Sequence, residues 1–222
     1  MKRVIVVALL LSLAAVGQAQ AQIDPALAES IAWYTGTTGR VDDDRARELL
    51  EQAQAGADTL STMWLARVYS TGRMTFPQDP AQARAIAATV IDDVETQALS
   101  GAAEAQFLMG TAYAEGLGKA VDADAAMHWY RLAAAQNHIL AQHNIGNAYR
   151  SGTGVAQSHA QAVYWWTLAA KQGDAIPQLR LGEAYESGRG VEKDRNEAIY
   201  WYQQAADRGN GDAQNALERL GE

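Results

Sequence analysis

A pattern of small and aromatic residues recurs in this sequence every 36 residues. Its clearest copy, residues 181–209, contains two glycines close together, a Trp-Tyr pair and an Ala-Ala pair, and similar copies occupy 145–173 and 109–137. A fixed period of this length indicates stacked copies of one supersecondary unit. One copy cannot bury its apolar face alone, whereas neighbouring copies can bury theirs against each other. The chain is therefore expected to form a solenoid.

Each copy is predicted to contain two helices joined by a glycine turn. In the last copy, Ala198 and Tyr202 are one turn apart on an apolar helical stripe. Gly188 and Gly190 precede this stripe, and glycine can adopt the positive φ that ends a helix and reverses the chain. Asp194 occupies the place where the second helix needs an N-cap. The unit is thus a helix-turn-helix.

Three recurring glycines are expected to let the two helices of a pair approach closely: Gly110, Gly146 and Gly182. A tryptophan side chain buries roughly 150–250 Å², which stabilises the fold by at most about 4–6 kcal/mol. Three tryptophans also recur with the 36-residue period: Trp129, Trp165 and Trp201. Because they lie on the second-helix stripe, they are interpreted as core residues rather than as a sugar-stacking ladder.

The repeat pattern divides the chain into seven segments. They are a signal peptide (1–21), a degenerate first repeat (22–57), a second repeat with insertions (58–102), three regular repeats (103–138, 139–174 and 175–210) and a capping helix (211–222). An insertion around residues 92–99 is expected to extend the second helix of the second repeat. The predicted fold is all-α: a right-handed α/α superhelical solenoid of about five helix-turn-helix repeats plus a C-terminal capping helix.

The N-terminal residues resemble a secretory signal peptide. Lys2 and Arg3 precede an apolar run at 4–16, and Ala19-Gln20-Ala21 forms an A-x-A cleavage site. The run is too short to span a membrane as a helix, and the sequence contains no cysteine for a lipid anchor. We expect cleavage before Gln22, a periplasmic or secreted protein, and no membrane insertion after cleavage.

The composition argues against several classes of function. Without Lys2 and Arg3 the chain has 16 basic and 26 acidic residues, which gives a net charge of −10. This negative charge disfavours binding to nucleic acid and to anionic membranes. The absence of cysteine rules out disulfides and thiol chemistry. The four histidines lack the spacing of a metal site, and no Ser-His-Asp set is evident. The sequence therefore predicts no catalytic residues, no metal and no cofactor.

The motif itself resembles a known repeat. Residues 181–209 follow the run Leu-Gly-x-x-Tyr-x-x-Gly-x-Gly-Val-x-x-Asp-x-x-x-Ala-x-x-Trp-Tyr-x-x-Ala-Ala-x-x-Gly, which is similar to the Sel-one-like repeat, a relative of the tetratricopeptide repeat. The earlier copies depart from it, for example at Lys119, Ser158 and Trp166. The resemblance implies an α/α superhelix that binds proteins on its concave face, and similar exported bacterial members act as adaptors in the cell envelope.

In such a superhelix the first helix of each unit faces the concave side. On this concave side we expect three positions of each first helix to be exposed: three residues before the recurring glycine, one residue after it, and six residues before it. The side chains at these positions are a mixture of apolar and charged groups. We hypothesise that they form a groove for a segment of another protein, although they could instead complete the packing between adjacent first helices. The candidate partner-binding residues are Leu60, Met63, Arg67, Phe107, Thr111, Leu140, His143, Asn147, Ile176, Leu179 and Glu183.

These inferences favour an exported non-enzymatic protein-binding scaffold, adaptor or regulator in the bacterial cell envelope, whose partner is another envelope protein. The alternative is a module that binds envelope polysaccharide or peptidoglycan through surface Trp and Tyr. Quenching of tryptophan fluorescence by glycans would favour this alternative.

Overall fold

The computed structural model describes residues 23–222, so the predicted signal peptide and its cleavage site lie outside the described residues. Over this range the chain forms twelve helices and no strand. None of these helices is long and apolar enough to cross a membrane. The all-α solenoid predicted from the repeat is confirmed.

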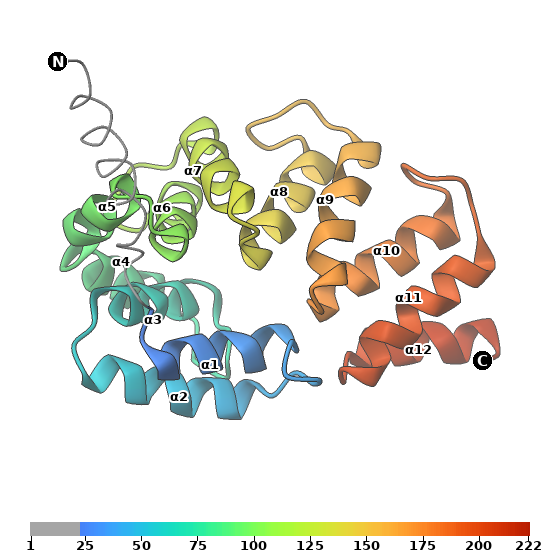
Figure 1. Ribbon diagram of the computed structural model, residues 1–222, viewed down its shortest axis with the longest axis horizontal. Coiled ribbons are helices and arrows are strands. Elements are labelled where there is room, and N and C mark those ends of the chain that lie inside the picture. The colour runs from blue at the N-terminus through green and yellow to red at the C-terminus, as the bar shows by residue number, and fades with distance from the viewer. Residues whose placement is uncertain (1–22) are drawn as a thin grey trace, which may run out of the picture.

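Successive helices pack as antiparallel pairs that follow one another around a curve (Figure 1). The pairs are α1 (Pro25–Thr35) with α2 (Asp43–Ala55), α3 (Thr59–Thr71) with α4 (Pro80–Ala88), α6 (Ala103–Glu115) with α7 (Ala123–Ala135), α8 (Ile139–Ser151) with α9 (His159–Lys171), and α10 (Ala175–Ser187) with α11 (Arg195–Asp207). Helix α5 (Ile91–Leu99) lies between the second and third pairs, and α12 (Gly211–Leu220) ends the stack.

The helix ends follow the predicted turn chemistry. Gly188 has a φ of 73° and its N–H donates to the carbonyl oxygen of Ala184 at 2.8 Å, which closes α10. Asp194 is the N-cap of α11, where one carboxylate oxygen accepts from the backbone N–H groups of Asn196 and Glu197. The same glycine and N-cap arrangement recurs in the preceding repeat at Gly152 and Ser158.

The close helix approach at the three recurring glycines is confirmed, and the structure shows what each glycine faces. A Cβ atom at Gly110, Gly146 or Gly182 would lie 2.4 Å from the ring of Tyr130, Trp166 or Tyr202, respectively. The second aromatic residue of each pair is therefore the one pressed against the first helix. The first aromatic residues, Trp129, Trp165 and Trp201, pack against the core while remaining partly exposed.

The expected extension of the second helix in the second repeat is wrong. Helix α4 ends at Ala88, and α5 begins separately at Ile91. The two residues between them, Thr89 and Val90, are β-branched, and the hydroxyl of Thr89 donates to the carbonyl oxygen of Ile86 at 2.7 Å. Helix α5 then buries its own apolar residues and packs against α6.

The first and last hairpins of the solenoid touch. The backbone N–H of Val41, in the turn after α1, donates to the carbonyl oxygen of Arg208 at the end of α11, with an N–O distance of 2.8 Å. A Cβ atom at Gly173, between α9 and α10, would lie 3.7 Å from the Cα of Thr37 in the same turn. Figure 1 shows the turn between α1 and α2 beside the junction of α11 and α12. The concave side is consequently closed along one edge.

Candidate binding site on the concave face

A hollow lies inside the curve of the solenoid, and we name it the central cavity. It has a volume of about 750 Å³. Its walls come from α1, α8 and α10, from the turn after α3, and from the chain segments around Val41 and around Gly209. The lining residues are Tyr34, Val41, Asp43, Gly72, Arg73, Leu140, His143, Asn147, Arg150, Asp174, Ile176, Arg180, Gly209, Asn210, Gly211 and Asp212.

The central cavity carries charges of both signs. Its lining includes three arginines and three aspartates: Arg73, Arg150, Arg180, Asp43, Asp174 and Asp212. Arg180 forms an ion pair with Glu183, in which Nη1 lies 2.8 Å from Oε2. Nδ1 of His143 lies 2.9 Å from Oδ2 of Asp174. Within residues 23–222, no carboxylate forms an ion pair with Arg73 or Arg150. The charges of these two guanidinium groups are therefore not neutralised by a close carboxylate in this part of the chain.

Arg73 is held in place by the last turn of α1. It donates a hydrogen bond to the hydroxyl of Tyr34, and its guanidinium carbon lies 5.9 Å from the centre of that ring. Across the same wall, the pKa of Asp43 is raised first by partial burial and then by the carboxylates of Asp44 and Asp42, while Arg73 opposes the rise. Arg73 and Asp43 thus interact electrostatically without forming a close pair.

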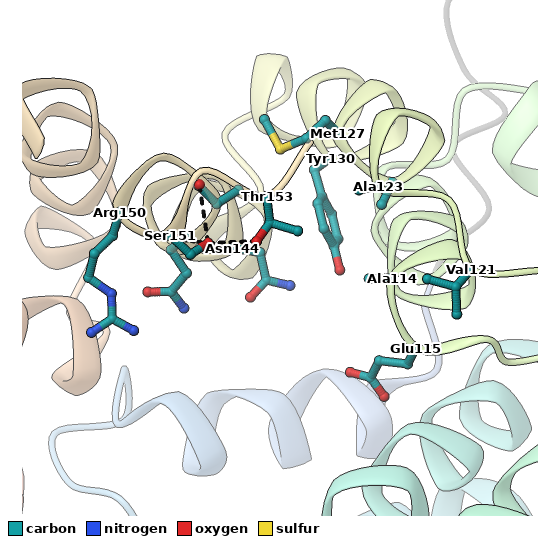
Figure 2. Close-up of a pocket in the computed structure, with 13 residues that line it drawn as sticks. Ala114, Glu115, Val121, Ala123, Met127, Tyr130, Asn144, Arg150, Ser151 and Thr153 are labelled. Atoms are coloured by element: carbon teal, nitrogen blue, oxygen red, sulfur yellow. Dashed lines mark hydrogen bonds between the residues drawn. The ribbon is translucent and has the colours of Figure 1, made fainter. Parts of the chain in front are cut away.

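A second hollow, the side pocket, opens next to the central cavity between α6, α7 and α8 (Figure 2). It has a volume of about 350 Å³ and shares Asn147 and Arg150 with the central cavity. Its floor is mostly apolar, and polar groups lie along its rim.

A third hollow of about 500 Å³ lies at the C-terminal end, between α10, α11 and α12. There Glu186 accepts hydrogen bonds from Arg219, at 2.8 Å, and from the hydroxyl of Tyr202, at 2.7 Å. The hydrogen bonds from Arg219 are the main reason that the pKa of Glu186 falls to about 2. The pKa of Tyr202 is raised, first by burial and then by its hydrogen bond to Glu186.

The structure distributes the predicted partner-binding residues over three environments. Leu140, His143, Asn147 and Ile176 line the central cavity, and Leu179 and Glu183 line the C-terminal hollow. Leu60, Met63, Arg67, Phe107 and Thr111 are buried and line none of the three hollows. Leu140, His143 and Leu179 are also largely buried, whereas Ile176 and Glu183 are exposed.

Contacts between neighbouring first helices hold two of the five buried residues, Arg67 and Phe107. The ring of Phe107 stacks on His138 with a centroid distance of 4.7 Å. The guanidinium of Arg67 lies 4.5 Å from the ring centre of Trp64 and 5.2 Å from that of Phe107. For these positions the observed burial favours the packing alternative, because the side chains face the adjacent helix rather than a free surface.

Sequence reasoning missed most of the charged wall. Arg73, Asp43, Asp174 and Asp212 adjoin helix ends, where acids are expected as caps and arginines as solvated surface residues. Charged residues clustered at helix ends were the available signal. These charged residues indicate one particular site only once the curvature of the solenoid has brought the helix ends together.

Within residues 23–222, no group of three or more His, Cys, Asp or Glu side chains is arranged to hold a metal ion. The hollows offer hydrogen-bond donors, acceptors and charges for holding a ligand in place.

A model of the Sel1 repeat matches residues 26–53, 60–86, 103–138, 139–174 and 178–210. The chain belongs to the Sel1 repeat family. A search of curated proteins found no match. The Sel1 solenoid architecture is that of a protein-interaction scaffold, and Sel1 repeat proteins generally work without enzyme activity.

Two solved structures are similar to this Sel1 repeat chain. One is a Sel1 repeat protein from Oxalobacter formigenes, with 32% identity and a TM-score of 0.58 over 81% of this chain and 50% of that chain. The other is c5321, described as a protective antigen present in uropathogenic Escherichia coli strains and displaying an SLR fold, with 26% identity and a TM-score of 0.59 over 95% of this chain and 50% of that one. The present chain thus spans about half the length of each.

Proposed function

We propose that this protein is an exported, non-enzymatic adaptor or regulator in the bacterial cell envelope, and that it grips a segment of another envelope protein on its concave face. The central cavity carries the proposal. Its volume of about 750 Å³ lies within the roughly 300–1,000 Å³ range of ligand-binding hollows. A folded domain would not fit in this volume, whereas a loop or a chain segment would.

The wall chemistry supports a polypeptide ligand. Ile176 is 39% exposed and offers an apolar anchor among charged neighbours. Arg73 and Arg150 offer donors, and Asp43 and Asp212 offer acceptors. An apolar anchor surrounded by polar groups that fix orientation is the usual arrangement of a protein-binding site. Export is supported by the signal-like pattern of residues 1–21.

The test compares two exposed apolar residues. A partner is captured from envelope extract with the wild-type protein, purified, and titrated against Ile176→Asp and Leu132→Asp. Leu132 on α7 is 37% exposed and lines none of the three hollows, so it is the matched control. We expect Ile176→Asp to weaken binding about tenfold or more, as for a central interface residue, and Leu132→Asp to leave it unchanged. Equal affinity of both variants would contradict the proposed site.

Export has its own measurement. N-terminal sequencing of protein recovered from the periplasm or the culture medium should give a chain that begins at Gln22. An uncleaved chain that remains in the cytoplasm would contradict the envelope location and leave the cavity test intact.

One observation favours the glycan-binding alternative. On the second helices α9 and α11, Tyr164 and Tyr200 are 55% and 52% exposed, and each packs edge-on against the tryptophan that follows it. Exposed aromatic faces can pack against the C–H faces of sugar rings. If soluble peptidoglycan fragments bind and Tyr164→Ala with Tyr200→Ala abolishes the binding, the glycan function is supported. If no glycan binds, it is rejected.

A further inference from the structure

The side pocket has an acid at one end and a base at the other. Glu115 is the last residue of α6, and Arg150 lies in the last turn of α8. Figure 2 shows their side chains at opposite ends of the pocket, with Tyr130 and Asn144 between them. The two groups come from different helix pairs and form no ion pair with each other.

The acid end lacks a hydrogen-bond donor. Oε2 of Glu115 is buried and has no partner among the described residues. Arg73 interacts with Glu115 electrostatically but does not form an ion pair with it. A buried acceptor without a donor is unfavourable, and more so when the group is charged. A ligand that brings an N–H donor to this oxygen would remove that cost.

Tyr130 supports the same end of the pocket. Burial raises the pKa of the Tyr130 hydroxyl, and the negative charge of Glu115 raises it further. The hydroxyl therefore keeps its proton at neutral pH and stays uncharged.

The groups at the basic end of the side pocket can bind an anion. The guanidinium of Arg150 lies 5.9 Å from the ring centre of Trp166. The indole N–H of Trp166 in turn donates to Oδ1 of Asn147 at 3.2 Å. This bond fixes the amide of Asn147, so that its nitrogen is left as a donor in the lining of the pocket. A guanidinium and an amide N–H₂ group together match a carboxylate.

An apolar surface joins the two ends. It is formed by Val121, Ala126, Met127 and Ala148, and the pocket volume is about 350 Å³. This volume lies at the small end of the roughly 300–1,000 Å³ range typical of ligand sites. Space of this kind suits a small molecule with an apolar body and charged ends.

We infer that the side pocket binds a short peptide with free ends, whose ammonium group approaches Glu115 and whose carboxylate approaches Arg150. A free amino acid has its two charges on one carbon atom, whereas an extended peptide separates them by about 3.3–3.6 Å for each residue. Glu115 and Arg150 lie at opposite ends of the pocket (Figure 2), which favours a ligand with its two charges at opposite ends, such as a short peptide, over a free amino acid. The inference does not depend on the protein partner proposed for the central cavity.

The probe is the tripeptide Ala-Leu-Ala, titrated into the purified protein by isothermal calorimetry. Forms with an acetylated N-terminus, with an amidated C-terminus, and with both are titrated in parallel, together with free leucine. We expect the free tripeptide to bind, and each blocked end to weaken binding about tenfold or more, the usual effect of losing a hydrogen bond to a charged group. Blocked peptides that bind as tightly as the free one, leucine that binds equally well, or no binding would overturn the inference.

Two variants assign the ends separately. Glu115→Gln should no longer discriminate between the free and acetylated tripeptides, and Arg150→Gln should no longer discriminate between the free and amidated ones. Arg189→Gln is the control, because Arg189 is an exposed arginine like Arg150 but lines none of the three hollows. Circular dichroism checks that every variant is folded. Discrimination that survives in Glu115→Gln or Arg150→Gln would contradict the assigned orientation.

Discussion

The three regular repeats and the irregular second repeat fill the space between their paired helices differently. In the last regular repeat, Gly182 on α10 faces Tyr202 on α11, and the ring occupies the space that a Cβ would need. In the second repeat, Ala66 and Ala87 occupy the corresponding positions, and both are fully buried. The large buried ring of this repeat lies instead on the first helix, where Trp64 is fully buried against Tyr34 and Phe107 of the neighbouring first helices and its indole N–H donates to Glu104 at 2.6 Å.

The first repeat shows a third solution. Ser30 on α1 and Leu50 on α2 hold the two corresponding positions, and the hydroxyl of Ser30 donates to the carbonyl oxygen of Ala46 at 2.6 Å. The comparison teaches that the shared constraint is the volume between the helices, which protein interiors keep close-packed. The regular repeats are recognisable in the sequence because they all meet this constraint with a glycine opposite a ring.

The largest effect is expected from removing a ring in a regular repeat. Trp166 is 4% exposed, and Trp166→Ala should lower the free energy of unfolding by about 3–5 kcal/mol. Tyr164→Ala on the same helix is the control, because that ring is mostly exposed and its loss should cost less than about 1 kcal/mol. Urea denaturation measures both. Similar losses in the two variants would show that the ring facing the glycine is not the main contributor.

A smaller effect is expected from adding one methyl group. Gly182→Ala should destabilise the protein by about 1–3 kcal/mol, because the new Cβ collides with Tyr202. This loss should appear although alanine favours a helix over glycine by about 1 kcal/mol. Combining it with Tyr202→Leu should cost less than the sum of the two single changes, since leucine restores the kind of pairing found in the first repeat. Additive losses in thermal denaturation would refute the shared-volume account.

The smallest effect concerns a group that distinguishes the last repeat from the others. The pKa of Glu186 is lowered to about 2 from 4.5, chiefly by hydrogen bonds from Arg219. A depressed carboxylate pKa contributes stability that is present above about pH 4.5 and is lost as the pH falls towards 2. The melting temperature of the wild type should therefore fall slightly more than that of Arg219→Gln over this range. The difference should be only a few degrees at most, because the pair is largely exposed.

Glu192→Gln is the control for this measurement, because Glu192 is exposed in the turn before α11. Its pH dependence should match that of the wild type. A wild type and an Arg219→Gln variant with the same pH dependence would show that the pair adds nothing to stability.

The parts of the fold that were predicted from the sequence depend on local chemistry. Gly188 ends α10, Asp194 caps α11 and Gly182 faces a ring because these roles follow from the residue itself and its position in the repeat. The break at Thr89–Val90 was missed, since an apolar helical stripe continues across it and only the local backbone shows the turn.

The hollows could not be predicted in the same way. The central cavity depends on the contact between Val41 and Arg208, which results from many small rotations between successive helix pairs. Glu115 directly precedes its cap glycine, whereas Arg150 is two residues before its own, so they occupy different positions in the repeat. The 36-residue repeat pattern therefore does not predict that these two charged side chains border one pocket.

The hydrogen bond between Val41 and Arg208 also affects how the molecule can come apart. Arrays of stacked repeats usually lose their terminal units first, because each unit is held by its neighbours alone. Here the outermost hairpins restrain each other, so fraying at one terminus must also release the other. We therefore expect unfolding to be more cooperative across the whole array, and folding to be slowed by a contact between two segments from opposite ends of the chain.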